Sequence, residues 1–110
     1  MTYDNAKDNC AEKLSNGGKL FEPATWDENK LVTTAFNDVH WSGGCWIGVN
    51  DIAVEANFKY ESSGATIPFN PTWYPGYQNK GTTTNCVWVY KAGRWGVNSC
   101  IENHPSICKL

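Results

Sequence analysis

The feature that most restricts how this chain can fold is its five cysteines in 110 residues. So many cysteines are unusual in a cytosolic protein, and with ten glycines and six tryptophans they favour a secreted or extracellular domain that disulfide bonds stabilise. A zinc site is the alternative, but the chain has no Cys-x-x-Cys pair, and His40 and His104 are isolated. We therefore expect disulfides, and no resident metal, in this fold.

Length and charge limit the size of the domain and its partners. A chain of 110 residues suffices for one modest core, so we expect a single domain over residues 1–110. The formal net charge of −2 does not produce the positive electrostatic field that favours binding to nucleic acid or acidic membranes. No apolar run approaches the roughly 20 residues of a membrane span. No signal-peptide pattern is seen, which indicates that one has been removed or that the chain is cytosolic.

Two helices are predicted in the first part of the sequence. Thr2 can cap the first helix, in which apolar residues recur every four positions: these are Ala6, Cys10 and Leu14. Thr25 and Glu28 form the capping-box pattern that begins a second helix. The apolar residues expected on its buried side are Val32, Ala35, Phe36 and Val39. Between the helices, Lys19-Leu20-Phe21 is predicted to be a short strand or an extended connector.

Strands are predicted after the helices. The apolar run within residues 45–51 favours a buried strand, and Gly48 inside it indicates that another backbone or a large ring packs closely there. Residues 86–90 alternate, which places Val87 and Val89 on the inward face and Trp88 and Tyr90 on the opposite face. Shorter strands are expected at residues 58–60 and 106–110. Helices followed by strands indicate an α+β fold.

Residues 61–85 show little periodicity and contain three prolines and three glycines. A loop of this length in a compact domain is usually functional or disordered. Its aromatic residues argue against disorder: they are Phe69, Trp73, Tyr74 and Tyr77. We therefore expect this loop to carry the function.

Taken together, the cysteine, glycine and tryptophan motifs resemble the C-type lectin-like domain, from about Thr2 to Lys109. The motifs that carry the resemblance are Cys10, Gly18-Lys19-Leu20, Trp46-Ile47-Gly48-Val49-Asn50-Asp51, Trp73-x-x-Gly76, Asn85-Cys86-Val87, Gly93-Arg94-Trp95, Cys100 and Ile107-Cys108. The resemblance implies two helices that flank small antiparallel β-sheets, and a long loop that carries the ligand site. It also implies the disulfides Cys10–Cys108 and Cys86–Cys100.

The chain departs from the family pattern at two places. The strand that family members usually have before the first helix is missing or reduced to one or two residues. Cys45 has no partner in the family pattern. We favour a buried free thiol at this position, because free cysteines are often buried. The alternative is an intermolecular bridge that would make a homodimer.

The motifs with which sugar-binding family members hold calcium are largely absent. A Glu-Pro-Asn or Gln-Pro-Asp motif is replaced by Tyr77-Gln78-Asn79, and an Asn-Asp pair by Gly96-Val97. Only Asn79 is still of a residue type with which the family binds calcium. From residue 62 to residue 101 there is no Asp or Glu, while three basic residues give a local balance of +3. Tight calcium sites depend on carboxylates. We therefore expect no cofactor; calcium held by distant carboxylates such as Asp51 or Glu55 is the alternative.

The candidate ligand-binding residues are the polar and aromatic side chains of the loop and of the strands beside it. They are Tyr74, Tyr77, Gln78, Asn79, Lys80, Trp88, Tyr90 and Trp95. Rings with polar tips supply contact area at low entropic cost. Trp88 and Tyr90 are either exposed beside the loop or cover a minor core. Trp95 is ambiguous, and Trp73 is expected to be mostly buried, because the matching family tryptophan is usually structural.

Three functions remain open on the sequence. The first is a calcium-independent recognition module whose loop face binds a glycan or a protein, and whose local positive charge would tolerate a sulfated sugar. The second is a calcium-dependent lectin with a displaced site, and the third is a structural or ice-binding role, with Thr82-Thr83-Thr84 as its only indication. An enzyme is not expected, because the four cysteines other than Cys45 are expected to be bridged.

Overall fold

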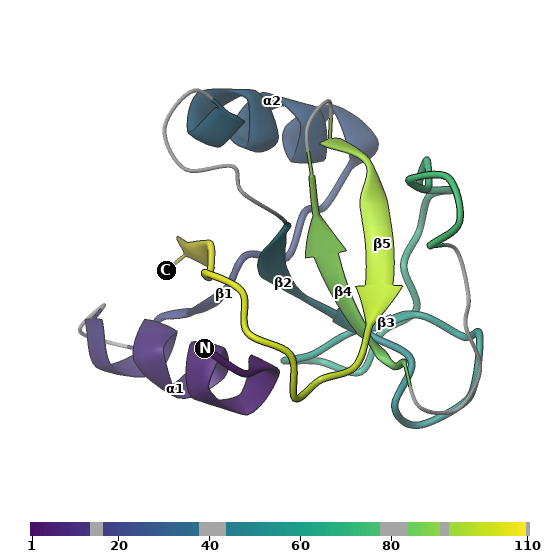
Figure 1. Cartoon of the computed structure of the whole chain (residues 1–110). Coiled ribbons are helices and arrows are strands. Elements are labelled where there is room, and N and C mark those ends of the chain that lie inside the picture. Colours follow the sequence, from purple (N-terminus) through teal and green to yellow (C-terminus); the bar gives the residue numbers. More distant parts are fainter. Residues whose placement is uncertain (14–16, 38–43, 78–83, 91–92, 110) are drawn as a thin grey trace.

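The computed structural model describes residues 1–13, 17–37, 44–77, 84–90 and 93–109, of which residues 34–37 are described for their backbone alone. Two helices and six strands lie in these ranges, as Figure 1 shows. Their bounds are α1 Tyr3–Lys13, β1 Lys19–Leu20, α2 Trp26–Asn37, β2 Cys45–Asn50, β3 Lys59–Tyr60, β4 Cys86–Val89, β5 Trp95–Asn98 and β6 Cys108–Lys109. The α+β class predicted from the order of the elements is confirmed.

The strands form two antiparallel sheets. The larger sheet has the order β3-β2-β4-β5, and the smaller one pairs β1 with β6. The helices α1 and α2 lie on opposite sides of the larger sheet (Figure 1). This is the arrangement of two helices flanking small antiparallel sheets that the resemblance implied.

The two faces of β2 and β4 contribute to two separate hydrophobic clusters. Val87 and Val89 lie in the cluster on the α2 side, with Ile47 and Val49 of β2. Trp88 lies in the cluster on the α1 side. The alternation predicted for residues 86–90 is therefore confirmed, because successive side chains of a strand point to opposite faces.

All six residues of β2 are buried, as its apolar sequence predicted. A side chain at Gly48 would clash with the preceding segment, because its Cβ would lie 2.6 Å from the Glu22 Cγ and 3.0 Å from the Leu20 carbonyl oxygen. The Gly48 N–H donates a hydrogen bond of 2.7 Å to the Phe21 carbonyl. The predicted close approach of another backbone is thus confirmed, and β1 supplies it.

Both helices begin at the predicted caps. The Thr2 hydroxyl accepts a hydrogen bond from the Asn5 N–H at 3.3 Å, and the Thr25 hydroxyl accepts one from the Glu28 N–H at 3.0 Å. Val32 is half-buried against the core. The predictions for Leu14, Val39 and the side chains of Ala35 and Phe36 lie outside the described residues.

Met1 lies beside His104, in the segment before β6. Its amino group donates to the His104 carbonyl at 3.1 Å, and its carbonyl accepts from the His104 N–H at 2.9 Å. These two backbone hydrogen bonds hold Met1 beside His104.

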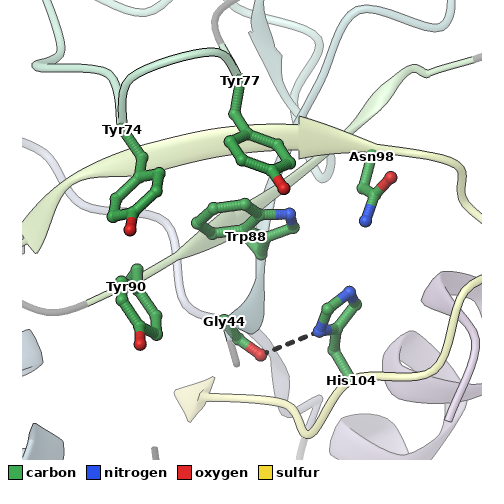
Figure 2. A pocket seen from close by; sticks show the side chains of 7 residues that line it. All are labelled: Gly44, Tyr74, Tyr77, Trp88, Tyr90, Asn98 and His104. Carbon is green, nitrogen blue, oxygen red and sulfur yellow. Dashed lines mark hydrogen bonds between the residues drawn. The ribbon is translucent and has the colours of Figure 1, made fainter. Parts of the chain in front are cut away.

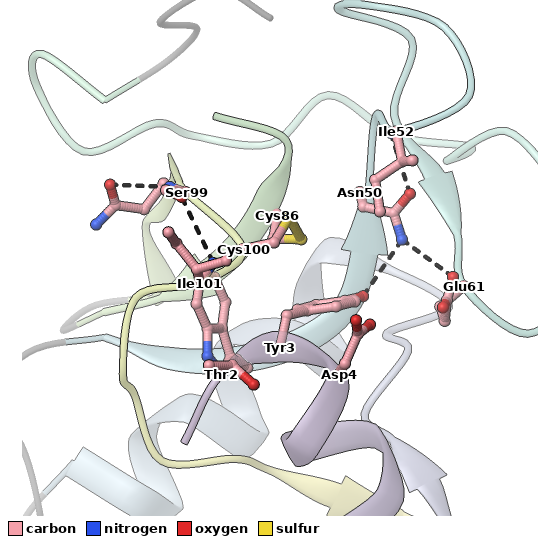
Figure 3. The surroundings of a disulfide bond; sticks show 12 residues. Thr2, Tyr3, Asp4, Asn50, Ile52, Glu61, Cys86, Ser99, Cys100 and Ile101 are labelled. Carbon is pink, nitrogen blue, oxygen red and sulfur yellow. Dashed lines mark hydrogen bonds between the residues drawn. A yellow bond between two sulfur atoms is a disulfide. The ribbon is translucent and has the colours of Figure 1, made fainter. Parts of the chain in front are cut away.

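The two disulfides join the pairs that the resemblance implied, Cys10–Cys108 and Cys86–Cys100, with Cα atoms 5.3 and 5.2 Å apart. Beside the second disulfide, the Asn50 side-chain amide donates to Tyr3 Oη at 3.4 Å and to Glu61 Oε2 at 3.1 Å (Figure 3). This network joins α1 to the larger sheet.

On the α2 side, Asn29 is fully buried and satisfies two other buried groups. Its Nδ2 donates to the Gly93 carbonyl at 2.8 Å, and its Oδ1 accepts from Trp95 Nε1 at 2.8 Å. One amide therefore fixes both the turn before β5 and the indole of Trp95.

Replacing Asn29 with alanine should destabilise the domain by about 2–5 kcal/mol, because it leaves the Trp95 N–H and the Gly93 carbonyl buried without partners. Urea unfolding measures the free energy, with the exposed Asn103→Ala as the matched control. A loss no larger than that of the control would contradict the role of Asn29.

Cys45 is free and only 5% exposed, which confirms the buried thiol. Burial raises the pKa of the Cys45 thiol to about 11, so the reactive thiolate is scarce at neutral pH. An intermolecular bridge through Cys45 would require β2 to expose its sulfur.

We expect the native protein to react with a thiol reagent such as dithionitrobenzoate far more slowly than the urea-unfolded protein, which should release one equivalent. A Cys45→Ala variant is the control and should release none in either state. Rapid labelling of one thiol in the native protein would contradict the buried position.

Candidate functional site

A cavity of about 240 Å³ opens on the α1 side of the larger sheet. The residues that line it come from the long loop, the position before β2, β4 and the position after it, β5 and the segment before β6, and Figure 2 shows that they converge. They are Gly44, Tyr74, Tyr77, Trp88, Tyr90, Asn98 and His104. We call this cavity the aromatic pocket.

The loop is held over the sheet by backbone hydrogen bonds to β5. The Tyr74 N–H donates to the Trp95 carbonyl at 2.7 Å, and the Val97 N–H donates to the Tyr77 carbonyl at 2.9 Å. The loop therefore runs beside β5 and presents its two tyrosines to the same face as Trp88. Tyr74 and Tyr77 have ring centroids 6.2 and 5.4 Å from that of Trp88.

Trp88 forms the floor of the pocket and packs against two glycines. A Cβ at Gly44 would lie 2.5 Å from Trp88 Cε3, and one at Gly96 would lie 2.3 Å from Trp88 Cζ2. The indole thus occupies the space that side chains at these two positions would need. Only 6% of Trp88 is exposed, so of the two interpretations left open, the one in which it covers a second core is confirmed.

His104 closes the pocket from the segment before β6. Its Nδ1 donates to the Gly44 carbonyl at 3.1 Å, and its ring lies edge-on to Trp46 with centroids 4.7 Å apart. Burial lowers the pKa of the His104 imidazole, while the bond to Gly44 and the carboxylate of Glu102 act in the opposite direction. The ring is therefore neutral near neutral pH.

Four of the eight candidate ligand-binding residues meet in this pocket: Tyr74, Tyr77, Trp88 and Tyr90. Trp95 is not among the residues that line this pocket: its side chain is fully buried, its N–H is bonded to Asn29, and it borders a second cavity, so its role as a contact residue stays a prediction. The predictions for Gln78, Asn79 and Lys80 lie outside the described residues.

Sequence reasoning missed Gly44, Asn98 and His104 as parts of the site. His104 was considered only as a zinc ligand or a partner of a nucleophile. Its position in the pocket depends on the antiparallel bonds with Met1 and on its contact with Trp46, which no local pattern indicates.

Of the residues at the family's calcium positions, the structure describes Tyr77, Gly96 and Val97. Gly96 and Val97 offer no side-chain oxygen, Val97 is fully buried, and Trp88 occupies the space above Gly96. No group of three or more His, Cys, Asp or Glu side chains that could hold a metal occurs among the described residues.

Two carboxylates remain as the alternative donors. Asp51 is 2% exposed; its Oδ2 accepts from the Ala56 N–H at 2.8 Å, and its Oδ1 has no hydrogen-bond partner among the described residues. Desolvation and the neighbouring Asp51 carboxylate raise the pKa of the exposed Glu55. Neither residue is among the described residues that line the aromatic pocket.

A second cavity of about 350 Å³ lies on the α2 side, between loops that include Phe58, Ile67 and Trp73. Trp73 is half-buried there, with its ring 5.0 Å from that of Phe58.

In the part of the chain that the structure describes, no helix is long and apolar enough to cross a membrane.

A Gly96→Ala replacement should destabilise the wild-type domain by about 1–3 kcal/mol, because the new Cβ meets the Trp88 ring. In a Trp88→Ala background the same replacement should have a much smaller effect, because the ring is gone. A double-mutant cycle by urea unfolding measures this coupling. Additive effects of the two changes would contradict the steric exclusion.

Comparison with known proteins identifies the family. The model of the lectin C-type domain matches residues 1–110. The alpha-N-acetylgalactosamine-specific lectin of Patiria pectinifera is 32% identical over 115 residues, which cover 99% of this chain and 68% of that protein. Human tetranectin is 30% identical over 99% of this chain, and the chain spans 54% of its length.

Solved structures share the fold. The C-type lectin CEL-I from Cucumaria echinata is 20% identical with a TM-score of 0.81, over 98% of this chain and 81% of that chain. A calcium-independent type II antifreeze protein is 25% identical with a TM-score of 0.75, over 100% of this chain and 79% of that chain. On these matches, the chain belongs to the C-type lectin domain family, whose members are non-enzymatic binding domains.

Proposed function

We propose that this domain binds a carbohydrate in the aromatic pocket and does so without calcium. The observation that carries the proposal is the position of Trp88, whose indole fills the space above Gly96 where the family pattern has a calcium ligand. An aromatic floor thus replaces the metal at the corresponding place in the fold.

Aromatic rings suit a sugar because the apolar C–H faces of a sugar ring pack on them, while tyrosine hydroxyls can bond its hydroxyl groups. Tyr74, Tyr77 and Tyr90 surround Trp88 with ring centroids 5.4–6.2 Å from it. A cavity of about 240 Å³ is smaller than sites for drug-sized ligands, which span about 300–1,000 Å³. The pocket therefore suits a single sugar residue, such as the end of a glycan chain.

The relatives support each half of the proposal. The Patiria pectinifera lectin is named for its specificity for alpha-N-acetylgalactosamine, which makes this sugar the first probe. The antifreeze protein with the same fold is described as calcium-independent. The two disulfides support an extracellular location, because such bonds persist in oxidising compartments.

Calcium dependence through Asp51 is the second candidate, because its Oδ1 is buried without a partner among the described residues. A single buried carboxylate with one exposed neighbour supplies few of the six to eight oxygens that calcium takes. Isothermal calorimetry with calcium tests this candidate directly. Saturable heat that disappears in Asp51→Asn would favour it over the calcium-independent site.

The main test is a glycan array that includes terminal alpha-N-acetylgalactosamine, galactose, mannose and sulfated sugars, with and without EDTA. We expect binding signals that EDTA does not change. Tyr90→Ala should weaken binding about tenfold through the loss of one ring contact in the pocket. Leu31→Ala, an exposed position on α2, is the control and should bind as the wild type does.

Binding that EDTA abolishes would contradict calcium independence. No glycan binding at all would contradict the carbohydrate function and leave a protein ligand or an ice surface as the partner. Thermal hysteresis measurements then distinguish an ice surface from a protein ligand.

A further inference from the structure

Two nitrogens in the wall of the aromatic pocket are buried and have no hydrogen-bond partner among the described residues, Trp88 Nε1 and His104 Nε2. We infer that these two atoms together bind one neutral hydroxyl group of the sugar. This inference rests on the proposed function and specifies which group the pocket recognises.

The two nitrogens have opposite hydrogen-bonding roles. The indole N–H of Trp88 can only donate. The Nδ1 of His104 gives its proton to the Gly44 carbonyl, so in the neutral ring Nε2 carries a lone pair and accepts. A hydroxyl group accepts and donates at the same time, and it can therefore satisfy both nitrogens.

The rings of Trp88 and His104 are neighbours among the residues that line the pocket. Their centroids are 6.4 Å apart with an interplanar angle of 36°. An oxygen about 2.9 Å from each of two nitrogens joins them over a span of up to about 6 Å. In Figure 2 the indole nitrogen and the imidazole nitrogen not bonded to Gly44 both lie on the side of the pocket where Asn98 stands.

Neighbouring polar groups do not satisfy these nitrogens. Asn98 Nδ2 donates to Glu102 Oε2 at 2.7 Å, and Asn98 Oδ1 accepts from the Ser99 N–H at 3.1 Å. The Glu102 carboxylate oxygen is 3.9 Å from His104 Nε2, beyond hydrogen-bond distance. Both nitrogens therefore keep an unused hydrogen-bonding capacity among the described residues.

Because one nitrogen donates and the other accepts, the two together discriminate between chemical groups of a ligand. A sulfate or carboxylate offers only acceptors and would face the lone pair of His104, whereas an ammonium offers only donors and would face the N–H of Trp88. Both nitrogens are buried, so a hydroxyl group reaches them only when neighbouring side chains of the pocket move slightly. A site with buried polar groups rejects an analogue that lacks the matching hydroxyl, because those groups are then left unpaired.

The test compares wild type with Trp88→Phe, which keeps an aromatic ring and removes the N–H, and with His104→Asn, whose shorter amide keeps a donor for Gly44 and leaves no acceptor at the position of Nε2. Trp73→Phe in the second cavity is the matched control. The probes are methyl alpha-N-acetylgalactosaminide, its 3-, 4- and 6-deoxy forms and its monosulfated forms, with affinities measured by calorimetry. Thermal melting checks that each variant is folded.

In the wild type we expect one deoxy form, and the form sulfated at the same position, to bind about five- to tenfold more weakly than the parent glycoside. In Trp88→Phe and in His104→Asn that difference should shrink to less than twofold, because one of the two partners of the hydroxyl is gone. Trp73→Phe should reproduce the wild-type pattern. If Trp88→Phe does not fold, His104→Asn carries the comparison alone.

A deoxy penalty that persists unchanged in a folded Trp88→Phe or His104→Asn overturns the inference while the proposed function stands. Equal binding of all deoxy forms by the wild type has the same consequence. If the wild type binds none of the probes and no glycan on the array, the proposed function fails and the inference fails with it.

Discussion

The pairing of β2 with β4 is the interaction on which both halves of the structure depend. Its register places Cys45 opposite Val89 and Trp46 opposite Trp88. A slip by one residue would move every side chain of β4 to the other face of the sheet. Trp88 would then enter the valine cluster under α2, and the aromatic pocket would lose its floor. The same ladder of hydrogen bonds thus specifies the core and the candidate site.

Local patterns predicted the elements well, because their causes are local. The alternation of residues 86–90 predicted the face of the sheet on which the Trp88 side chain lies, and the Thr25 cap predicted the start of α2. The disulfide pairs followed from family resemblance and not from spacing. What sequence could not predict depends on distant partners: Trp95 is buried because an amide 66 positions earlier accepts its N–H, and His104 lies in the site because Met1 holds its backbone.

The pairing of β4 with β5 links the side chains of two positions at the candidate site. Position 96 lies directly opposite Trp88 in the pairing of β4 with β5, so their side chains share one face. A large ring at position 88 requires glycine at position 96, and a ligating side chain at position 96 requires a smaller residue at position 88. A change of chemistry at this face therefore involves at least these two positions together, while the strands beneath them stay the same.

The Cys10–Cys108 bond has a topological consequence. It joins residues 98 positions apart and so encloses almost the whole chain in one covalent ring. A protease that cuts once anywhere inside this ring opens it without separating the pieces. A molecule cleaved in its long loop would keep its mass, apart from one added water, until a reductant broke the bridge. In an extracellular setting this connectivity lets an exposed loop be nicked without the loss of a fragment.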